Sequence, residues 1–273
     1  MFSDYINTLI ALVGNRHVRK SRRLWGGLLV SLLGYITLGV DPIALCVDWP
    51  DPYAILQRSY EVAGSLDSSA MTTSYGISTF SVETAGVLGY VREWRKYPTY
   101  WRREAVFNGL MRLGGDDGTI MWESVSPGKI DTIRDSARLA ERMLDSLLAE
   151  QEELNRESKI FKVAYLGLDS VGEFICYVVS VTNTVTGSVV DHYIDTTACL
   201  ERKLVETRDG EENLLLLSDY RAVGTYLVSF REDGRYGTNG PTMTILTVKF
   251  VPNVPLPDSI FRPSIDSLKG WTY

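Results

Sequence analysis

Residues 159–261 consist almost entirely of short segments in which apolar and polar side chains alternate. Turn sequences rich in Asn, Asp and Gly separate nearly all of these segments, and no helix-like stretch lies between them. Parallel strands need long crossover connections, usually helices, so this pattern predicts antiparallel strands. The expected strands are 159–168, 174–182, 189–195, 203–207, 214–220, 226–230 and 243–251.

The segment 72–123 shows the same alternation, interrupted by Gly and Pro, and predicts a second group of antiparallel strands. Two stretches have helical spacing instead. Residues 53–66 place their apolar side chains on one stripe, and residues 130–157 have one apolar and one charged face. Charged residues of the longer stretch, including Arg142, are expected to face solvent. The chain is therefore predicted to be an α+β protein built on antiparallel strands.

The first 46 residues differ from the rest in charge and hydrophobicity. Five Arg or Lys residues between positions 16 and 23 precede an apolar run, 24–40, which is followed by Ala44-Leu45-Cys46. A basic segment, an apolar segment and a small-x-small site are typical of a cleaved secretory signal. An uncleaved anchor and a lipid attached to Cys46 are the alternatives. We expect residues 1–46 to be a signal sequence or N-terminal membrane anchor, and residues 47–273 to form an exported domain.

The charge and the motif content restrict the function classes. The chain has 28 basic and 34 acidic residues, and five of the basic residues lie in the first 46 positions. The remaining domain is acidic, which argues against a nucleic-acid partner. Of the two histidines, only His192 lies beyond the first 46 residues. The sequence contains no phosphate loop, nucleotide fingerprint or paired CxxC. We expect no enzyme, cofactor or metal, with a hydrolase based on two carboxylates as the alternative.

Two cysteines, Cys176 and Cys199, remain beyond the N-terminal segment. Both lie in strand-like sequence. A disulfide between them is possible in an oxidising compartment, and two buried thiols are the alternative.

Residues 90–104, YVREWRKYPTYWRRE, crowd five aromatic and five basic side chains into one stretch. Within it, Trp94, Lys96 and Pro98 follow one another at intervals of two. Further along, residues 117–122 read Asp-Gly-x-x-x-Trp, and residues 261–263 read Phe-Arg-Pro. These motifs and their order resemble the periplasmic outer-membrane lipoprotein carriers, the LolA-like family, over about residues 50–264.

One position departs from the family pattern. In the best-known carriers an Arg directly precedes this Pro and helps to hold a helical lid closed, whereas this chain has Tyr97. The resemblance therefore does not imply that transfer uses the same lid switch.

The resemblance implies a fold and a function. The fold is an incompletely closed antiparallel β half-barrel whose concave apolar face is covered by helices. The implied protein is a periplasmic carrier that binds acyl chains of lipoproteins or other lipids and moves them towards the outer membrane, between inner-membrane donor and outer-membrane acceptor proteins. The alternative is a sensor of the same fold that detects lipoproteins and signals to a protein partner. The residues expected to line the cavity and its rim are Leu88, Tyr90, Trp94, Lys96, Tyr97, Phe107 and Trp122.

Overall fold

The computed structural model describes residues 50–64, 71–126, 129–134, 139, 142, 143, 147, 151–208, 210–235 and 237–264. The predicted signal or anchor, residues 1–46, lies outside the described residues and stays a prediction. Among the described residues, no helix is long and apolar enough to cross a membrane.

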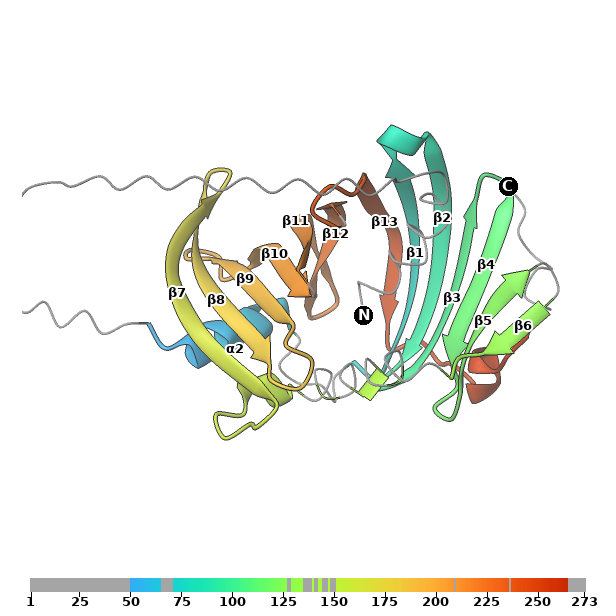
Figure 1. Ribbon diagram of the computed structural model, residues 1–273, viewed down its shortest axis with the longest axis horizontal. Coiled ribbons are helices and arrows are strands. Elements are labelled where there is room, and N and C mark those ends of the chain that lie inside the picture. The colour runs from blue at the N-terminus through green and yellow to red at the C-terminus, as the bar shows by residue number, and fades with distance from the viewer. Residues whose placement is uncertain are drawn as a thin grey trace, which may run out of the picture. The chain divides into compact units, whose positions relative to one another are not determined.

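The described residues form one antiparallel sheet of thirteen strands, which bends strongly (Figure 1). The strand order is β6-β5-β4-β3-β2-β1-β13-β12-β11-β10-β9-β8-β7, and the two edge strands β6 and β7 do not pair, so the sheet is open. This confirms the prediction of a large, incompletely closed antiparallel sheet. The strands are β1 (Thr73–Val82), β2 (Val87–Lys96), β3 (Tyr100–Phe107), β4 (Leu110–Asp116), β5 (Met121–Ser126), β6 (Lys129–Thr132), β7 (Phe161–Val171), β8 (Phe174–Asn183), β9 (Val189–Asp195), β10 (Glu201–Arg208), β11 (Glu211–Val223), β12 (Tyr226–Arg235) and β13 (Thr242–Pro252).

Short turns join most neighbouring strands. Between β3 and β4, for example, Asn108 and Gly109 both have positive φ angles, 47° and 74°. This is the backbone of a two-residue turn that matches the twist of a hairpin, and Asn-Gly is the sequence that favours it. The described residues also contain short 3₁₀ helices, which are η1 (Glu83–Ala85), η2 (Glu152–Leu154) and η3 (Asp258–Phe261).

Helix α2 (Pro52–Ala63) confirms the first predicted helix. The Asp51 side chain accepts a hydrogen bond from the backbone N–H of Tyr53 and so caps the first turn, with Pro52 at the first helical position. The helix ends earlier than predicted because Gly64 adopts a left-handed conformation, φ 76°, and closes the last turn.

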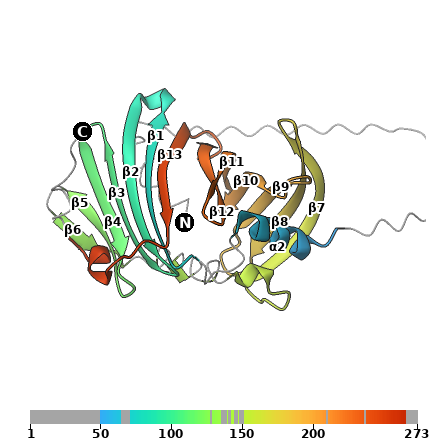
Figure 2. The same ribbon diagram turned by 180° about the vertical axis from the view of Figure 1, so that it is seen from behind.

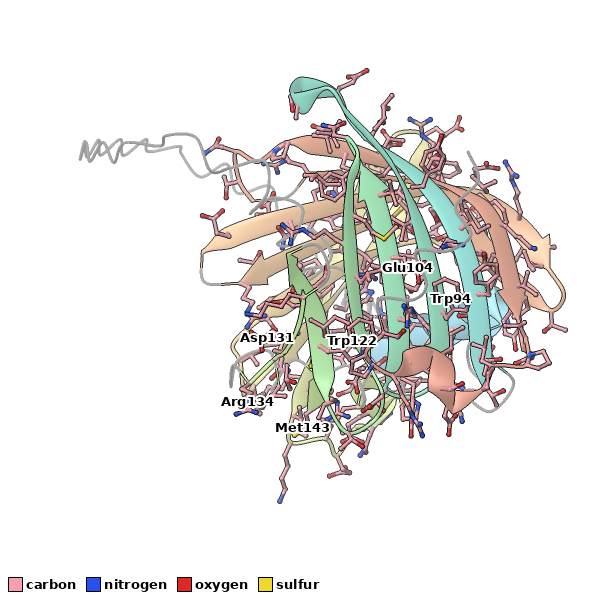
Figure 3. All side chains as sticks on the ribbon, turned by 90° about the vertical axis from the view of Figure 1, so that its right-hand side faces the viewer. Trp94, Glu104, Trp122, Asp131, Arg134 and Met143 are labelled. Carbon is pink, nitrogen blue, oxygen red and sulfur yellow. The ribbon has the colours of Figure 1, made fainter. Side chains whose placement is uncertain are left out.

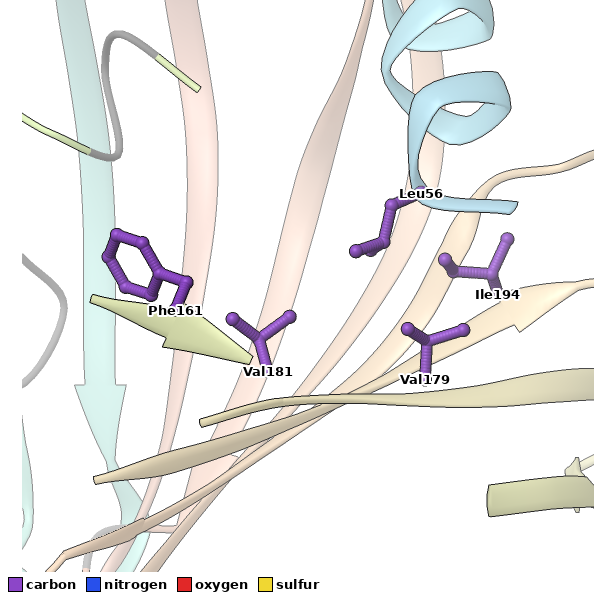
Figure 4. Packing of buried hydrophobic residues seen from close by; sticks show 5 residues of the cluster. All are labelled: Leu56, Phe161, Val179, Val181 and Ile194. Carbon is purple, nitrogen blue, oxygen red and sulfur yellow. The ribbon is translucent and has the colours of Figure 1, made fainter. Parts of the chain in front are cut away.

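Helix α2 lies against β7, β8, β9 and β12, as the view from behind shows (Figure 2). Its Leu56 points into a cluster of buried side chains (Figure 4). The sheet residues of this cluster are Phe161, Val179, Val181 and Ile194.

The second predicted helix, 130–157, is wrong at both ends. Lys129–Thr132 forms strand β6, which pairs with β5, and Glu152–Leu154 is a 3₁₀ turn. Pairing of β6 satisfies backbone groups of β5 that would otherwise lie at a sheet edge, which outweighs the local helical spacing. Residues 139, 142, 143 and 147 are helical, and the rest of 135–150 lies outside the described residues. Arg142 does not face solvent freely, because its Nε lies 2.6 Å from Oδ2 of the buried Asp116.

The two faces of the sheet can be followed from strand to strand, because residues directly opposite each other in a ladder share a face. We call the face on which α2 packs the helix face. Starting from Val179 below α2, the register carries this face across β9 to β12 and then to β3. Its members along this path are Val179, His192, Leu204, Leu215, Leu217, Glu232, Ile245, Phe80, Gly89 and Phe107.

Candidate functional site

The helix face carries a buried apolar surface over β1, β2 and β3. The rings of Phe80 and Phe107 meet edge to face, with centroids 6.2 Å apart. The Phe80 ring lies directly against Gly89, where an added Cβ would come within 2.4 Å of the ring. Val87 and Val91 are buried on the same face. These side chains form a continuous apolar wall on this half of the sheet.

A second apolar surface lies on the helix face at the end of the β7–β8 hairpin. Leu168 pairs with Tyr177, two residues before the core residue Val179, so both are on the helix face. The Tyr165 and Tyr177 rings pack edge to face at 6.2 Å. Leu168 and Ile175 are 61% and 59% exposed. Unlike the wall on β1–β3, this apolar surface is accessible to a ligand.

Charged side chains occupy the helix face next to the apolar wall. Two residues beyond Val91 lies Glu93, which forms ion pairs with both Arg95 and Arg103. The Nε atom of Arg103 donates to Oε2 of Glu93 at 2.7 Å. Burial alone would raise the pKa of Glu93, but the two guanidinium groups lower it to about 2. Glu93, Arg95 and Arg103 therefore form a cluster that stays ionised at physiological pH, beside apolar side chains.

Glu232 on β12 is a second, different carboxyl group on the helix face. It is half-buried, and among the described residues no basic side chain forms an ion pair with it. Burial, together with the negative charge of Glu93, raises the pKa of Glu232 to about 7. The charge of this part of the face therefore changes near neutral pH.

A buried polar network joins α2 and η2 to the sheet. The Tyr60 hydroxyl of α2 donates to Oε1 of Glu153 in η2 at 2.8 Å. His192 on β9 is bonded through Nδ1 to Oε1 of Glu201 on β10 at 2.5 Å. Burial raises the pKa of Glu153. Burial lowers the pKa of His192, but the carboxylates of Glu201, Glu153 and Asp191 outweigh this and raise it overall.

We expect the docking of α2 on the sheet to weaken as the pH rises. A raised pKa in both Glu153 and His192 means that the docked state binds protons more tightly than the undocked state. The stabilising contribution is therefore lost as the pH rises above their ordinary values of 4.5 and 6.5 and through the raised values. Hydrogen exchange of α2 amides, corrected for the intrinsic pH dependence, should show less protection at pH 8 than at pH 6.

The matched variant for this test is Glu153→Gln, which keeps an oxygen that accepts from Tyr60 and removes one of the two titrating groups. Its loss of α2 protection between pH 6 and pH 8 should be smaller than in the parent protein. Protection that stays constant or rises over this range in the parent would contradict the expectation.

The structure places six of the seven predicted site residues on the two faces of the sheet. Phe107 lies on the helix face, and Tyr97 follows the end of β2, where its backbone N–H donates to the Thr72 carbonyl at 3.0 Å. The other five lie on the opposite face. They are Leu88, Tyr90, Trp94, Lys96 and Trp122.

Those five do not form one surface with Phe107. Leu88 is 71% exposed, Tyr90 is also exposed, and the Trp94 ring packs on Tyr75 with centroids 5.3 Å apart. Trp94 and Arg95 lie on opposite faces of β2, and Arg95 is on the helix face beside Glu93. A role of the seven residues in lipid binding stays a prediction.

On the opposite face, the family-like motifs hold the C-terminal segment in place. The indole Nε1 of Trp122 donates to the carbonyl of Phe261 at 2.9 Å, and Lys96 lies 2.5 Å from Asp258. Figure 3 shows η3 in front of the strands near Trp122. Arg102 donates to the carbonyls of Ile260 and Ser264 at 2.9 and 3.0 Å.

Glu104 forms an ion pair with Arg102, which contacts the C-terminal segment. It was not among the predicted residues. It is 1% exposed and accepts hydrogen bonds from Arg92 at 2.7 Å and from Arg102 at 3.0 Å. The signal was present in the sequence. Pairing residues outward from the turn at Pro98 places Arg92 opposite Glu104 and Trp94 opposite Arg102.

The Asp-Gly motif forms a tight turn. Oδ1 of Asp117 accepts from the N–H groups of Thr119 and Ile120, both at 2.9 Å. Cys176 and Cys199 are free thiols. Within the described ranges, no three His, Cys, Asp or Glu side chains are placed to hold a metal ion.

The sequence matches no family model and no curated protein sequence. Solved structures do match. A DUF1329 family protein from Desulfovibrio piger has a TM-score of 0.55 at 14% identity, covering 80% of this chain and all of that chain. A domain described as an outer membrane lipoprotein-sorting protein, from Vibrio parahaemolyticus, has a TM-score of 0.53 at 12% identity, covering 77% and 95%. A LolA superfamily protein from Nitrosomonas europaea has a TM-score of 0.52 at 14% identity, covering 76% and 97%.

These three similarities extend over most of both chains in each comparison. At such identities they establish the fold, which is LolA-like.

Proposed function

We propose that the helix face of this LolA-like sheet binds acyl chains of lipoproteins or other lipids, and that the protein carries them through the periplasm towards the outer membrane. The observation that carries the proposal is the accessible apolar surface of Leu168 and Ile175 on the face that also holds the Phe80–Phe107 wall. The fold shared with a LolA superfamily protein and a lipoprotein-sorting domain supports it. A donor protein in the inner membrane and an acceptor in the outer membrane would complete the route.

The energetics suit a carrier without catalytic residues. Burial of an acyl chain of about fifteen methylene groups is worth roughly 12 kcal/mol relative to water, at about 0.8 kcal/mol per methylene. Escape into water is therefore slow. The acyl chain begins and ends its path in a membrane, so most of this free energy of burial cancels between the start and the end of transfer. The packing of α2 on the helix face can then decide between loading and release.

The proposal predicts that charge on the accessible apolar surface weakens acyl binding. In Leu168→Asp/Ile175→Asp, two carboxylates replace apolar side chains at the expected contact. We expect the dissociation constant for a triacylated lipopeptide to rise at least tenfold, which corresponds to about 1.4 kcal/mol. The measurement is fluorescence titration, with the same peptide lacking acyl groups as the negative ligand.

Leu88→Asp is the matched control. Leu88 is somewhat more exposed than Leu168 but lies on the opposite face, so its replacement should leave the dissociation constant unchanged. If Leu88→Asp abolishes binding and the double variant does not, the ligand binds on the opposite face, where five of the predicted residues lie. If neither the parent protein nor any variant binds the lipopeptide, the proposed function is wrong.

A further inference from the structure

Strand β7 forms one edge of the sheet. In the sheet it has β8 as its only neighbour among the described residues, and it is eleven residues long. An edge of this kind offers a row of backbone N–H and C=O groups to another strand. Two large apolar side chains, Leu166 and Leu168, are exposed along it. The edge therefore has the hydrogen-bonding groups and the apolar area that a pairing strand needs.

A β-bulge in β7 brings two opposite charges to the same face. In a regular strand, residues seven apart, such as Lys162 and Asp169, point to opposite faces. Here the register shifts between Tyr165 and Gly167, so that one extra residue is inserted. As a result Lys162 lies opposite Thr182 and Asp169 opposite Cys176, and these two β8 residues are six apart. Lys162 and Asp169 thus point to the same face of the sheet. Their backbone N–H and C=O groups also have the same direction relative to the edge, because these alternate with a period of two.

We propose that β7 pairs antiparallel with β7 of a second copy of this chain. A two-fold axis at the bulge would place the four residues before it, 161–164, opposite the four residues after it, 167–170, of the second copy. Lys162 then faces Asp169 of the second copy, and Val163 faces its Leu168. Because the axis is two-fold, both contacts occur twice.

The register is complementary in charge. An edge lysine normally discourages pairing, because it brings an unpaired charge against the incoming strand. In this register each lysine meets an aspartate, and both side chains are exposed in the single chain. The pairing also keeps the two helix faces on the same side. The two β7–β8 apolar surfaces would lie next to each other across the axis.

A charge swap tests the proposal. The mass of the protein, purified as the cell processes it, is measured by sedimentation over a range of concentrations. The parent protein should show twice the mass of one chain. Lys162→Glu places two acidic side chains opposite each other and should weaken the dimer at least tenfold. Lys162→Glu/Asp169→Lys restores opposite charges and should restore the dimer.

Lys129→Glu is the control, because Lys129 is an exposed lysine on the other edge strand, β6. It should leave the dimer intact. A parent protein that stays monomeric at all concentrations overturns the proposal. So does a dimer that Lys162→Glu leaves intact, that Lys129→Glu weakens equally, or that the double swap fails to restore. Lipopeptide binding by the Lys162→Glu monomer separates this result from the proposed function, which does not require the dimer.

Discussion

Replacing Glu104 by Gln is expected to lower the free energy of unfolding by about 3–5 kcal/mol. Glu104 is 1% exposed and is the shared partner of two guanidinium groups, those of Arg92 and Arg102. Loss of its charge leaves both cations near the protein interior without their carboxylate. Removal of one member of a buried ion pair has a large cost because the desolvated partner remains. Urea unfolding followed by tryptophan fluorescence measures the change.

The control for Glu104 is Glu61→Gln. Glu61 forms an ion pair with Arg58 on the surface of α2, where water solvates both groups. This variant should unfold at the same urea concentration as the parent protein. A Glu104→Gln variant that also unfolds there would show that the buried pair contributes nothing net to stability.

Replacing Trp122 by Ala should be about as costly, at about 3–5 kcal/mol, because it removes a large, fully buried side chain. The ring fills the space beside Gly115, where an added Cβ would lie 2.5 Å from it, and packs against Arg102. The variant also loses the hydrogen bond to the Phe261 carbonyl. We therefore expect faster hydrogen exchange in residues 258–264 as well as earlier unfolding in urea.

Trp122→Phe separates the two contributions. It keeps most of the ring volume and loses the hydrogen bond, which costs about 1 kcal/mol. Release of the C-terminal segment in Trp122→Ala but not in Trp122→Phe would assign the effect to packing. Unchanged exchange of residues 258–264 in both variants would show that Trp122 does not hold this segment.

Strands with a regular period of two could be predicted from the sequence. The stretch 189–195 matches β9, and 174–182 matches β8 to within one residue. At the candidate site the same rule identifies two faces of the sheet and does not say which of them a ligand would contact. In β2 and β3 both faces bury side chains: Val91 and Phe107 on one, Arg102 and Glu104 on the other. A search for buried apolar residues overlooks the second group, since its members are charged.

Contacts between distant segments were also beyond sequence reasoning. Two carbonyl partners of Arg102 lie in 260–264, and β1 pairs with β13, the first and last of the described strands along the sequence. No local pattern encodes such a pairing. The helical spacing of 130–157 predicted the wrong state for residues 130–132, which lie in β6, where pairing with β5 decides the structure.

The position of β13 between β1 and β12 has a consequence for how the protein is made. Tyr75 pairs with Val251, 176 residues later, so the centre of the sheet cannot close before nearly the whole chain has been synthesised. Closing such a loop costs on the order of 4–5 kcal/mol of chain entropy. Until then β1 and β12 are additional open edges, prone to pair with other chains. A chain that ends before residue 242 keeps both edges permanently and is expected to aggregate.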